Sequence, residues 1–298
     1  MELTWGLMIV IYLFAAGLSA GAMITSNLSY LYGGEDFQRV SRIGALITPF
    51  PISLGLGVLV LDLGSPFNFY QLFLTLEVSS PMSYGSWLIL VFSIFSFINF
   101  YLWLPKKFQI FGQTLQLEKG KKLLAKIMPF LSVGVASYTG LLLNAAVRPI
   151  WNAPLLPILF LVSAFSTGVA AVILIATLSP WGRARHKELH VLTMTDVGLI
   201  ILECLLILSI IVMGRFSSNS ESAAFGSLLY GHYAWIFWLL IVGLGLMLPL
   251  LLEFMELKNK ISVKWTWPVT ISSSFLVIFG GFFVRYIITY AGQTSSWF

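Results

Sequence analysis

Residues 137–168, SYTGLLLNAAVRPIWNAPLLPILFLVSAFSTG, consist of two apolar segments joined by a short linker at 148–154. Proline ends a preceding helix and is tolerated in the first turn of the next one. The linker also holds Arg148 and Trp151, and both residue types suit the headgroup layer of a bilayer. The stretch therefore predicts a membrane hairpin with a short turn. Tyr138 lies about two and a half turns inside the first arm, as a polar ring among small and aliphatic residues.

Composition places the whole chain in the membrane. Hydrophobic residues make up 58% of the 298 positions and charged residues 10%, whereas soluble proteins carry roughly a quarter charged residues. The single cysteine, Cys204, excludes an internal disulfide and an iron–sulfur cluster, which needs several thiolates. The first residues lack a basic region and a small-residue cleavage site, so we interpret them as a spanning helix and not as a removed signal peptide.

Eight runs are long enough for a hydrocarbon core of ~30 Å, which needs about 20 residues of helix. They are residues 5–32, 43–63, 84–104, 127–147, 155–179, 191–213, 230–252 and 265–290. The predicted fold is an all-α integral membrane protein with one membrane domain over 1–298. No gap between the runs is long enough for a large soluble domain, so chemistry outside the lipid is expected to belong to a partner.

The distribution of basic residues predicts the orientation. Fourteen of the 17 Lys and Arg residues lie in the first, third, fifth and seventh gaps. The other side has Arg148 and Arg215, and Arg285 lies within the last run. Because basic loops stay in the cytoplasm, both termini are expected on the extracytoplasmic side.

The sequence of three gaps between the runs predicts how each gap lies relative to the membrane. Residues 64–83 contain no basic residue and many Phe and Leu, which indicates a segment lying in the outer interface. Residues 214–229 are rich in Ser, Asn and Gly and are interpreted as a flexible outer loop. The basic stretch 105–126 is interpreted as an anchor of topology, on the cytoplasmic side.

Histidine placement argues against haem. A haem in a helix bundle usually needs facing histidines within the membrane, but His186 and His190 lie in a predicted inner loop and His232 at the start of the seventh run. The spacing of His186 and His190 is compatible with a shared metal, although their sequence, RARHKELH, is more typical of a solvated basic loop. We therefore expect no haem and no metal site in this chain.

Polar residues within the lipid zone are the candidates for function, because each is costly there. They are Tyr12, Asp62, Tyr138, Asp196, Glu203 and Arg285. Asp196 and Glu203 are seven residues apart, nearly two turns, and so share one helix face. The alternative for each carboxyl is a structural hydrogen bond, and for Arg285 it is a side chain that extends to the outer interface.

Five short motifs occur in an order that resembles the NrfD/PsrC family. They are LDLGSP at 61–66, SPMSYGSW at 80–87, SYTGLLL at 137–143, WNAPLLP at 151–157 and GGFFVRY at 280–286. Members of this family are the quinone-binding membrane subunits of polysulfide reductase and related complexes, and the resemblance covers essentially the whole chain.

The resemblance implies two four-helix bundles, here 5–147 and 154–290, and a menaquinone site near the outer face. It also implies an extracytoplasmic partner with four [4Fe–4S] clusters, usually joined to a molybdopterin subunit, in a bacterial cytoplasmic (inner) membrane. Membrane lipid, and not nucleic acid, is the other expected partner.

Tyr138 occupies the position of the family's quinone-contacting tyrosine. In the polysulfide reductase branch an Asn and a His on the first helix also meet the quinone, whereas here Tyr12 is the nearest equivalent of that His and no Asn matches. A tyrosine donates a hydrogen bond but does not accept a proton near neutral pH as His does.

The predicted function is therefore menaquinol oxidation, with Tyr12, Tyr138 and Arg285 as cofactor-binding residues and Asp62 and Glu203 as the catalytic carboxylates that handle protons. Asp62 is the expected essential acceptor, because it lies at the outer end of its helix. Two alternatives stay open: a secondary transporter or other ion-translocating protein using Asp196 and Glu203, and a structural anchor without quinone.

Overall fold

The computed structural model describes residues 5–74, 80–105, 109, 117–146, 148–179, 186–258 and 260–294. All regular elements in these ranges are helical. The longer helices are α1 (Leu7–Tyr32), α2 (Gln38–Ile47), α3 (Pro49–Asp62), α5 (Pro81–Trp103), α6 (Leu117–Asn144), α7 (Leu156–Leu178), α8 (His186–Arg215), α9 (Asn219–Tyr230), the π-helix η4 (Ile236–Met247), α10 (Leu248–Leu257) and α11 (Val263–Thr294).

Eight helical segments in the described ranges are long and apolar enough to cross a membrane, which confirms the predicted number of spans. Six of them are single helices. The second span, Glu35–Asp62, includes α2 and α3, and the seventh, Ile236–Leu257, consists of η4 followed by α10.

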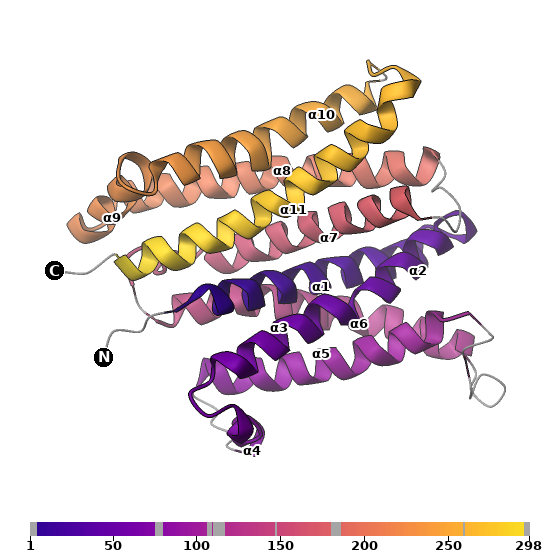
Figure 1. Cartoon of the computed structure of the whole chain (residues 1–298), viewed down its shortest axis with the longest axis horizontal. Helices are drawn as coiled ribbons and strands as arrows, with labels where there is room; N and C mark the ends of the chain where they lie inside the picture. The colour runs from indigo at the N-terminus through magenta and orange to yellow at the C-terminus, as the bar shows by residue number, and fades with distance from the viewer. Residues whose placement is uncertain are drawn as a thin grey trace.

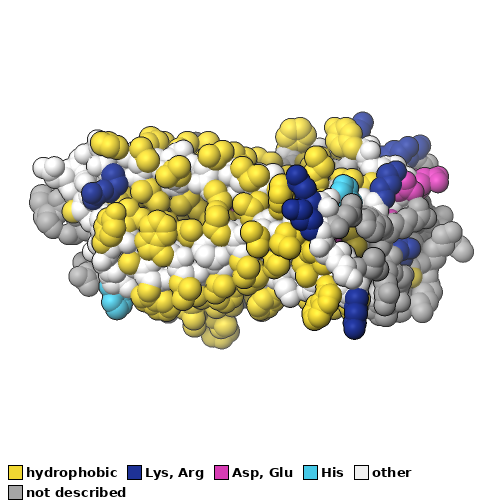
Figure 2. Space-filling view, turned by 90° about the horizontal axis from the view of Figure 1, so that it is seen from above, with side chains coloured by type: hydrophobic (Ala, Val, Ile, Leu, Met, Phe, Trp, Pro, Cys, Tyr) yellow, Lys and Arg dark blue, Asp and Glu magenta, His cyan; other side chains and the backbone are white. Residues whose placement is uncertain are grey.

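The spans run side by side, and both chain ends lie at the same end of the molecule (Figure 1). On the face shown in Figure 2, hydrophobic side chains cover the middle, and most Lys and Arg side chains lie toward the opposite end. We call the end that holds the chain termini the terminal end and the other the basic end. This apolar band between polar ends is the surface expected of a membrane-spanning chain.

Helices α1 and α7 form the centre of the molecule, and their apolar windows are 67% and 72% buried. Small residues explain their close approach. A Cβ atom at Gly21 of α1 would clash with the backbone of Ala164 of α7, and one at Gly168 would clash with the backbone of Gly21. The two glycines therefore allow α1 and α7 to make a backbone-to-backbone contact.

The second span is divided into two helices, α2 and α3, between Ile47 and Pro49. The sequence at this point explains the break. Pro49 begins α3 and has no N–H to continue the α2 hydrogen-bond ladder. Beside the break, Ser19 Oγ donates a hydrogen bond to the carbonyl of Thr48 at 3.0 Å, and Thr48 Oγ1 donates to the carbonyl of Gly44 at 2.7 Å.

The gap at residues 64–83 crosses no membrane in its described part. It contains a 3₁₀ turn, Pro66–Asn68, and the short helix α4, Gln71–Leu74. Phe67 and Leu74 are 92% and 74% exposed. Exposed apolar side chains beside the apolar band are compatible with the predicted interfacial position.

Residues 219–230 form helix α9, so the interpretation of 214–229 as a flexible loop is wrong. Ser218 caps the helix by accepting a hydrogen bond from the backbone N–H of Glu221 at 3.3 Å. The Glu221 carboxylate is buried and accepts a hydrogen bond from the side-chain amide of Asn152 at 3.1 Å. A capped helix that packs against the linker thus replaces the expected loop.

The linker between α6 and α7 is held from both sides, as the hairpin prediction requires. Asn144 donates hydrogen bonds from its side-chain amide to the carbonyls of Trp151 and Ala153 at 3.0 and 3.2 Å. Trp151 Nε1 donates to the carbonyl of Ile288 in α11 at 2.7 Å. The turn is therefore fixed to the last helix at the terminal end.

Candidate functional site

Two of the predicted cofactor-binding residues, Tyr12 of α1 and Tyr138 of α6, lie together in the terminal half of the molecule. Both side chains are buried, and their phenol groups are close enough to interact electrostatically. Neither hydroxyl has a hydrogen-bond partner among the described residues. The pair therefore has donor capacity available for a ligand.

Gly85 of α5 makes room for this pair. A Cβ atom at Gly85 would clash with the ring and the hydroxyl of Tyr138. On the other side, a Cβ atom at Gly55 of α3 would lie 3.4 Å from the backbone carbonyl oxygen of Tyr12. Two of the motifs that carry the family resemblance, SPMSYGSW and SYTGLLL, therefore meet at the contact between Gly85 and Tyr138.

The tyrosine pair fits a quinone by its chemistry. A quinone carbonyl is a hydrogen-bond acceptor, and a tyrosine hydroxyl is a donor. Small-molecule sites are mostly apolar, with a few polar groups that fix orientation, and the two hydroxyls occupy such a position within the hydrophobic core.

Arg285 of α11 is fully buried, so its side chain does not extend to the interface. Its Nη1 donates to the carbonyl of Gly281 at 2.7 Å and to Ser163 Oγ of α7 at 3.2 Å. The guanidinium carbon lies 5.3 Å from the ring centroid of Phe160 and 5.8 Å from that of Phe14. Such cation–π contacts stabilise a desolvated cation.

A buried carboxyl balances this charge. Glu203 of α8 is 4% exposed and interacts electrostatically with Arg285, and the hydroxyl of Ser163 lies beside it. Asp196 is fully buried, and its Oδ1 accepts a hydrogen bond from Ser166 Oγ of α7 at 2.6 Å. Both predicted carboxyls of the sixth span therefore face α7 and not lipid.

The structure does not bring all five predicted site residues into one cluster. Tyr12 and Tyr138 face each other across α1 and α6, whereas Arg285 and Glu203 meet across α7, α8 and α11. Asp62 is exposed and is the last residue of α3, at the terminal end. The roles assigned to these residues stay predictions, and their placement forms two neighbouring groups with α1 between them.

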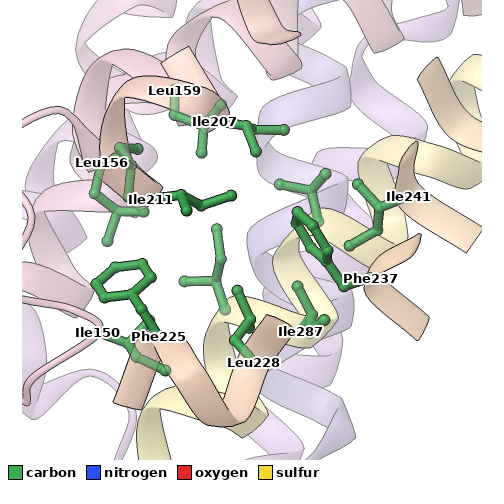
Figure 3. Close-up of a pocket in the computed structure, with 13 residues that line it drawn as sticks. Ile150, Leu156, Leu159, Ile207, Ile211, Phe225, Leu228, Phe237, Ile241 and Ile287 are labelled. Atoms are coloured by element: carbon green, nitrogen blue, oxygen red, sulfur yellow. The ribbon is translucent and has the colours of Figure 1, made fainter. Parts of the chain in front are cut away.

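An apolar pocket lies between α7, α8, α9, η4 and α11 (Figure 3). The space between its lining residues, including the part that is open to the outside, is about 480 Å³, and Leu159, Ile207, Phe225, Phe237 and Ile287 point into it from five elements. All of its lining side chains are hydrocarbon. The pocket therefore suits an acyl or isoprenoid chain but has no group that would orient a polar headgroup.

Several residues of these two groups were not predicted from the sequence. Gly85 had no signal beyond its place in a motif, because sequence spacing says nothing about contacts between helices. Ser163 and Ser166 are three residues apart and therefore share a helix face. This spacing indicates a functional role only when it is known that Asp196 and Glu203 face the two serines. Outside these groups, Glu253 of α10 is 2% exposed and lies just beyond residue 252, where the seventh run was predicted to end.

The described residues contain no group of three or more His, Cys, Asp or Glu side chains that is arranged to hold a metal ion. His186 and His190 belong to helix α8, so their predicted place in an inner loop is wrong, and His190 is exposed at the basic end.

Among solved structures, this protein resembles one from bd oxidase of Geobacillus thermodenitrificans, with a TM-score of 0.67. The match covers 97% of this protein and 86% of the other, at 12% sequence identity. At this identity the likeness concerns the arrangement of helices alone.

Sequence comparison is more specific. The C subunit of polysulfide reductase from Wolinella succinogenes is 32% identical over 305 residues, covering 97% of this sequence and 94% of that protein. The Hdr-like menaquinol oxidoreductase integral membrane subunit of Archaeoglobus fulgidus is 24% identical, over 88% of this sequence and 65% of its own length. The family model described as polysulphide reductase, NrfD matches residues 1–295. The protein therefore belongs to the NrfD family, as its motifs predicted.

Proposed function

We propose that this protein is the membrane anchor and quinone-binding subunit of a respiratory oxidoreductase complex, and that it oxidises menaquinol near the outer face. The observation that carries the proposal is the buried pair of Tyr12 and Tyr138, whose hydroxyls have no partner among the described residues. The names of the relatives, a polysulfide reductase subunit and a menaquinol oxidoreductase subunit, support it.

In this proposal the tyrosine pair holds the quinone headgroup. The two hydroxyls donate hydrogen bonds to its oxygens, and Gly85 leaves the space in which the Tyr138 ring takes its position. When bound, menaquinol supplies two electrons and two protons. The protein's own contribution is to bind and orient the headgroup, to exclude water and to remove the protons.

Arg285 and Glu203 form the second part of the proposed site. The guanidinium provides a fixed positive charge in a desolvated environment, where electrostatic interactions are stronger than in water. Its Nε and Nη2 have no hydrogen-bond partner within the described part of the chain and are available to an oxygen atom of a ligand or to water.

Two carboxylates are proposed to receive the protons. Asp62 is exposed at the terminal end, so a proton that reaches it passes directly to the aqueous phase. Glu203 is buried and passes a proton only through further groups. Asp62 is therefore the proposed essential acceptor, and Glu203 the proposed second one.

The wider architecture completes the proposal. The charge bias of the loops supports placing the terminal end outside the cell, in a bacterial cytoplasmic membrane. The first four spans and the last four form the two proposed bundles. An extracytoplasmic [4Fe–4S] subunit, together with a molybdopterin subunit, would dock at the terminal end and receive the electrons.

The experiment that tests the proposal is purification of the intact complex in mild detergent, followed by solvent extraction and mass spectrometry of bound quinone. We expect menaquinone in the wild-type complex and a reduced amount in the Tyr12→Phe, Tyr138→Phe double variant. A complex that copurifies with its partners but contains no quinone, and that does not oxidise quinol, would show a purely structural anchor.

A further inference from the structure

Four acidic residues follow one another along α8 and α10, where these helices pack against α7 and α11. Glu203 lies near the middle of α8, Asp196 lies two turns nearer the basic end, and Glu253 and Glu256 lie in the last turns of α10. Helix α8 packs against α10, and Glu253 interacts electrostatically with both Asp196 and Glu256. The four carboxyls thus connect the neighbourhood of Arg285 with the basic end.

Each of these carboxyls has a hydroxyl beside it, and each hydroxyl belongs to a different helix from its carboxyl. Ser166 donates to Asp196 at 2.6 Å, and Thr270 Oγ1 of α11 lies 2.9 and 3.0 Å from the two carboxylate oxygens of Glu256. Ser163 lies beside Glu203, and Ser273 of α11 lies beside Glu253. Hydroxyl groups both donate and accept hydrogen bonds, so they can carry a proton between carboxyls.

Three of the four carboxyls have an oxygen atom whose hydrogen-bonding capacity is unused. Oε1 of Glu203, Oδ2 of Asp196 and Oε2 of Glu253 have no partner in the described part of the chain, and these residues are 4%, 0% and 2% exposed. At the Arg285 end of the row, Nε and Nη2 of the guanidinium are in the same condition. Buried polar atoms are normally satisfied by protein or by ordered water, so we expect water molecules between these groups.

The spacing shows where such water is required. Asp196 and Glu203 are seven residues apart on α8, which corresponds to a rise of about 10 Å along the helix axis. This is too long for direct transfer between two carboxyls.

We propose that Glu203, Asp196, Glu253 and Glu256, with their hydroxyl partners and bridging water, form a proton path between the quinone site and the aqueous phase at the basic end. The inference rests on the proposed function and extends the role of Glu203. For each menaquinol oxidised, two electrons leave at the terminal end and two protons are released. A proton taken by this path reaches the opposite face, so it separates charge across the membrane, whereas a proton that leaves at Asp62 does not.

The reverse reaction allows a direct test in vesicles of phosphatidylethanolamine and phosphatidylglycerol that contain the purified complex. Reduced methyl viologen, added outside, delivers electrons only to complexes whose partner subunits face outward. Dimethylnaphthoquinone takes up two of these electrons and two protons. If the path operates, part of those protons comes from the lumen, and a lumenal pH dye reports alkalinisation for each quinone reduced.

We expect the Asp196→Asn and Glu253→Gln variants to lose this lumenal proton uptake. Glu221→Gln is the matched control, since Glu221 is a buried carboxyl at the terminal end, outside the row, and should leave the uptake unchanged. Quinone reduction by the wild type without lumenal alkalinisation, or equal uptake in Glu253→Gln, would overturn the path.

A second measurement needs no quinone and keeps the two proposals separate. Infrared spectroscopy of the purified complex, transferred to D₂O, follows hydrogen–deuterium exchange of the carboxylic C=O band that Asp196→Asn removes. With a path to water through Glu253, exchange of this band is fast in the wild type and slowed in Glu253→Gln. An equal rate in both would overturn the path even if quinone binding is demonstrated. If quinone chemistry fails but exchange is slowed, the path stands and the proposed function does not.

Discussion

Gly85 of α5 and Tyr138 of α6 are in direct contact, and no side chain larger than hydrogen fits at Gly85 without moving the phenol of Tyr138. The position of one proposed quinone contact is therefore determined by a residue on a different helix. The contact also explains why a glycine is required at a helix position where it otherwise lowers stability.

We predict that Gly85→Ala displaces the Tyr138 ring and lowers quinol turnover, while the complex still assembles. Overpacking of this kind costs about 1–3 kcal/mol. Gly198→Ala in α8 is the matched control, since a Cβ atom there meets nothing within 4 Å. Quinol-dependent reduction of the partner, measured at equal amounts of assembled complex, should fall for Gly85→Ala alone. Equal turnover in both variants would contradict the link between Gly85 and the site.

For Tyr138→Phe we expect turnover to fall roughly 5- to 150-fold, because loss of a hydrogen bond in a desolvated site costs on the order of 1–3 kcal/mol. Ring volume is kept, so assembly should be unaffected. Tyr286→Phe serves as the control, because Tyr286 is a tyrosine of α11 outside the pair. If Tyr138→Phe turns over quinol like the wild type, its hydroxyl does not contact the headgroup.

The two carboxylates should differ in their effects. Asp62→Asn is expected to reduce quinol-dependent reduction of the partner by about 100-fold or more, the usual contribution of a proton-transferring group, and Glu203→Gln should leave a substantial fraction. The comparison uses initial rates at matched quinol concentration. The reverse order of severity would mean that most protons leave through the interior row and not at the terminal end.

Orientation is tested by cysteine labelling in a Cys204→Ser background. Asn219→Cys is preferable to a change at Ser218, because Ser218 caps α9. A membrane-impermeant maleimide added to intact cells should label Asn219→Cys and spare Gln113→Cys, which lies in the basic stretch 105–126, beyond the described residues. Labelling of Gln113→Cys alone would invert the proposed topology.

Stability of the hairpin turn is expected to depend on Asn144. Removing its amide with Asn144→Ala leaves two linker carbonyls without their donor, at a cost of about 1–3 kcal/mol. Thermal unfolding of the purified complex should shift to a lower temperature. Ser209→Ala, which loses a hydroxyl that bonds within its own exposed helix, should leave the transition unchanged.

Hydropathy and charge were sufficient to predict the eight spans, because the length of an apolar run is set by the thickness of the bilayer. They did not predict the break at Thr48 or the π-helix of the seventh span, since neither changes mean hydropathy. Helix α9 had a usable signal: Ser218 and Glu221 have the spacing of a helix N-terminal capping box.

Prediction of the site was less complete for a different physical reason. The polar residues in lipid could be identified because such residues are rare in membrane spans. Which of these side chains contact one another depends on the rotation and packing of the helices. Tyr12 and Tyr138 interact with each other, and Arg285 interacts with Glu203, a pairing that the sequence did not predict. Glu253 was overlooked, because the seventh span was predicted to end at residue 252.

The contact of Gly21 with Gly168 has a consequence for how the protein is built. The face of α1 that contains Gly21 is covered only when α7 arrives, and α7 is made more than a hundred residues later. During synthesis, this face of α1 is therefore not covered by α7 until the fifth span has been inserted. Completion of the first half depends on insertion of the second, so a protein truncated before α7 should be recognised and degraded by membrane proteases.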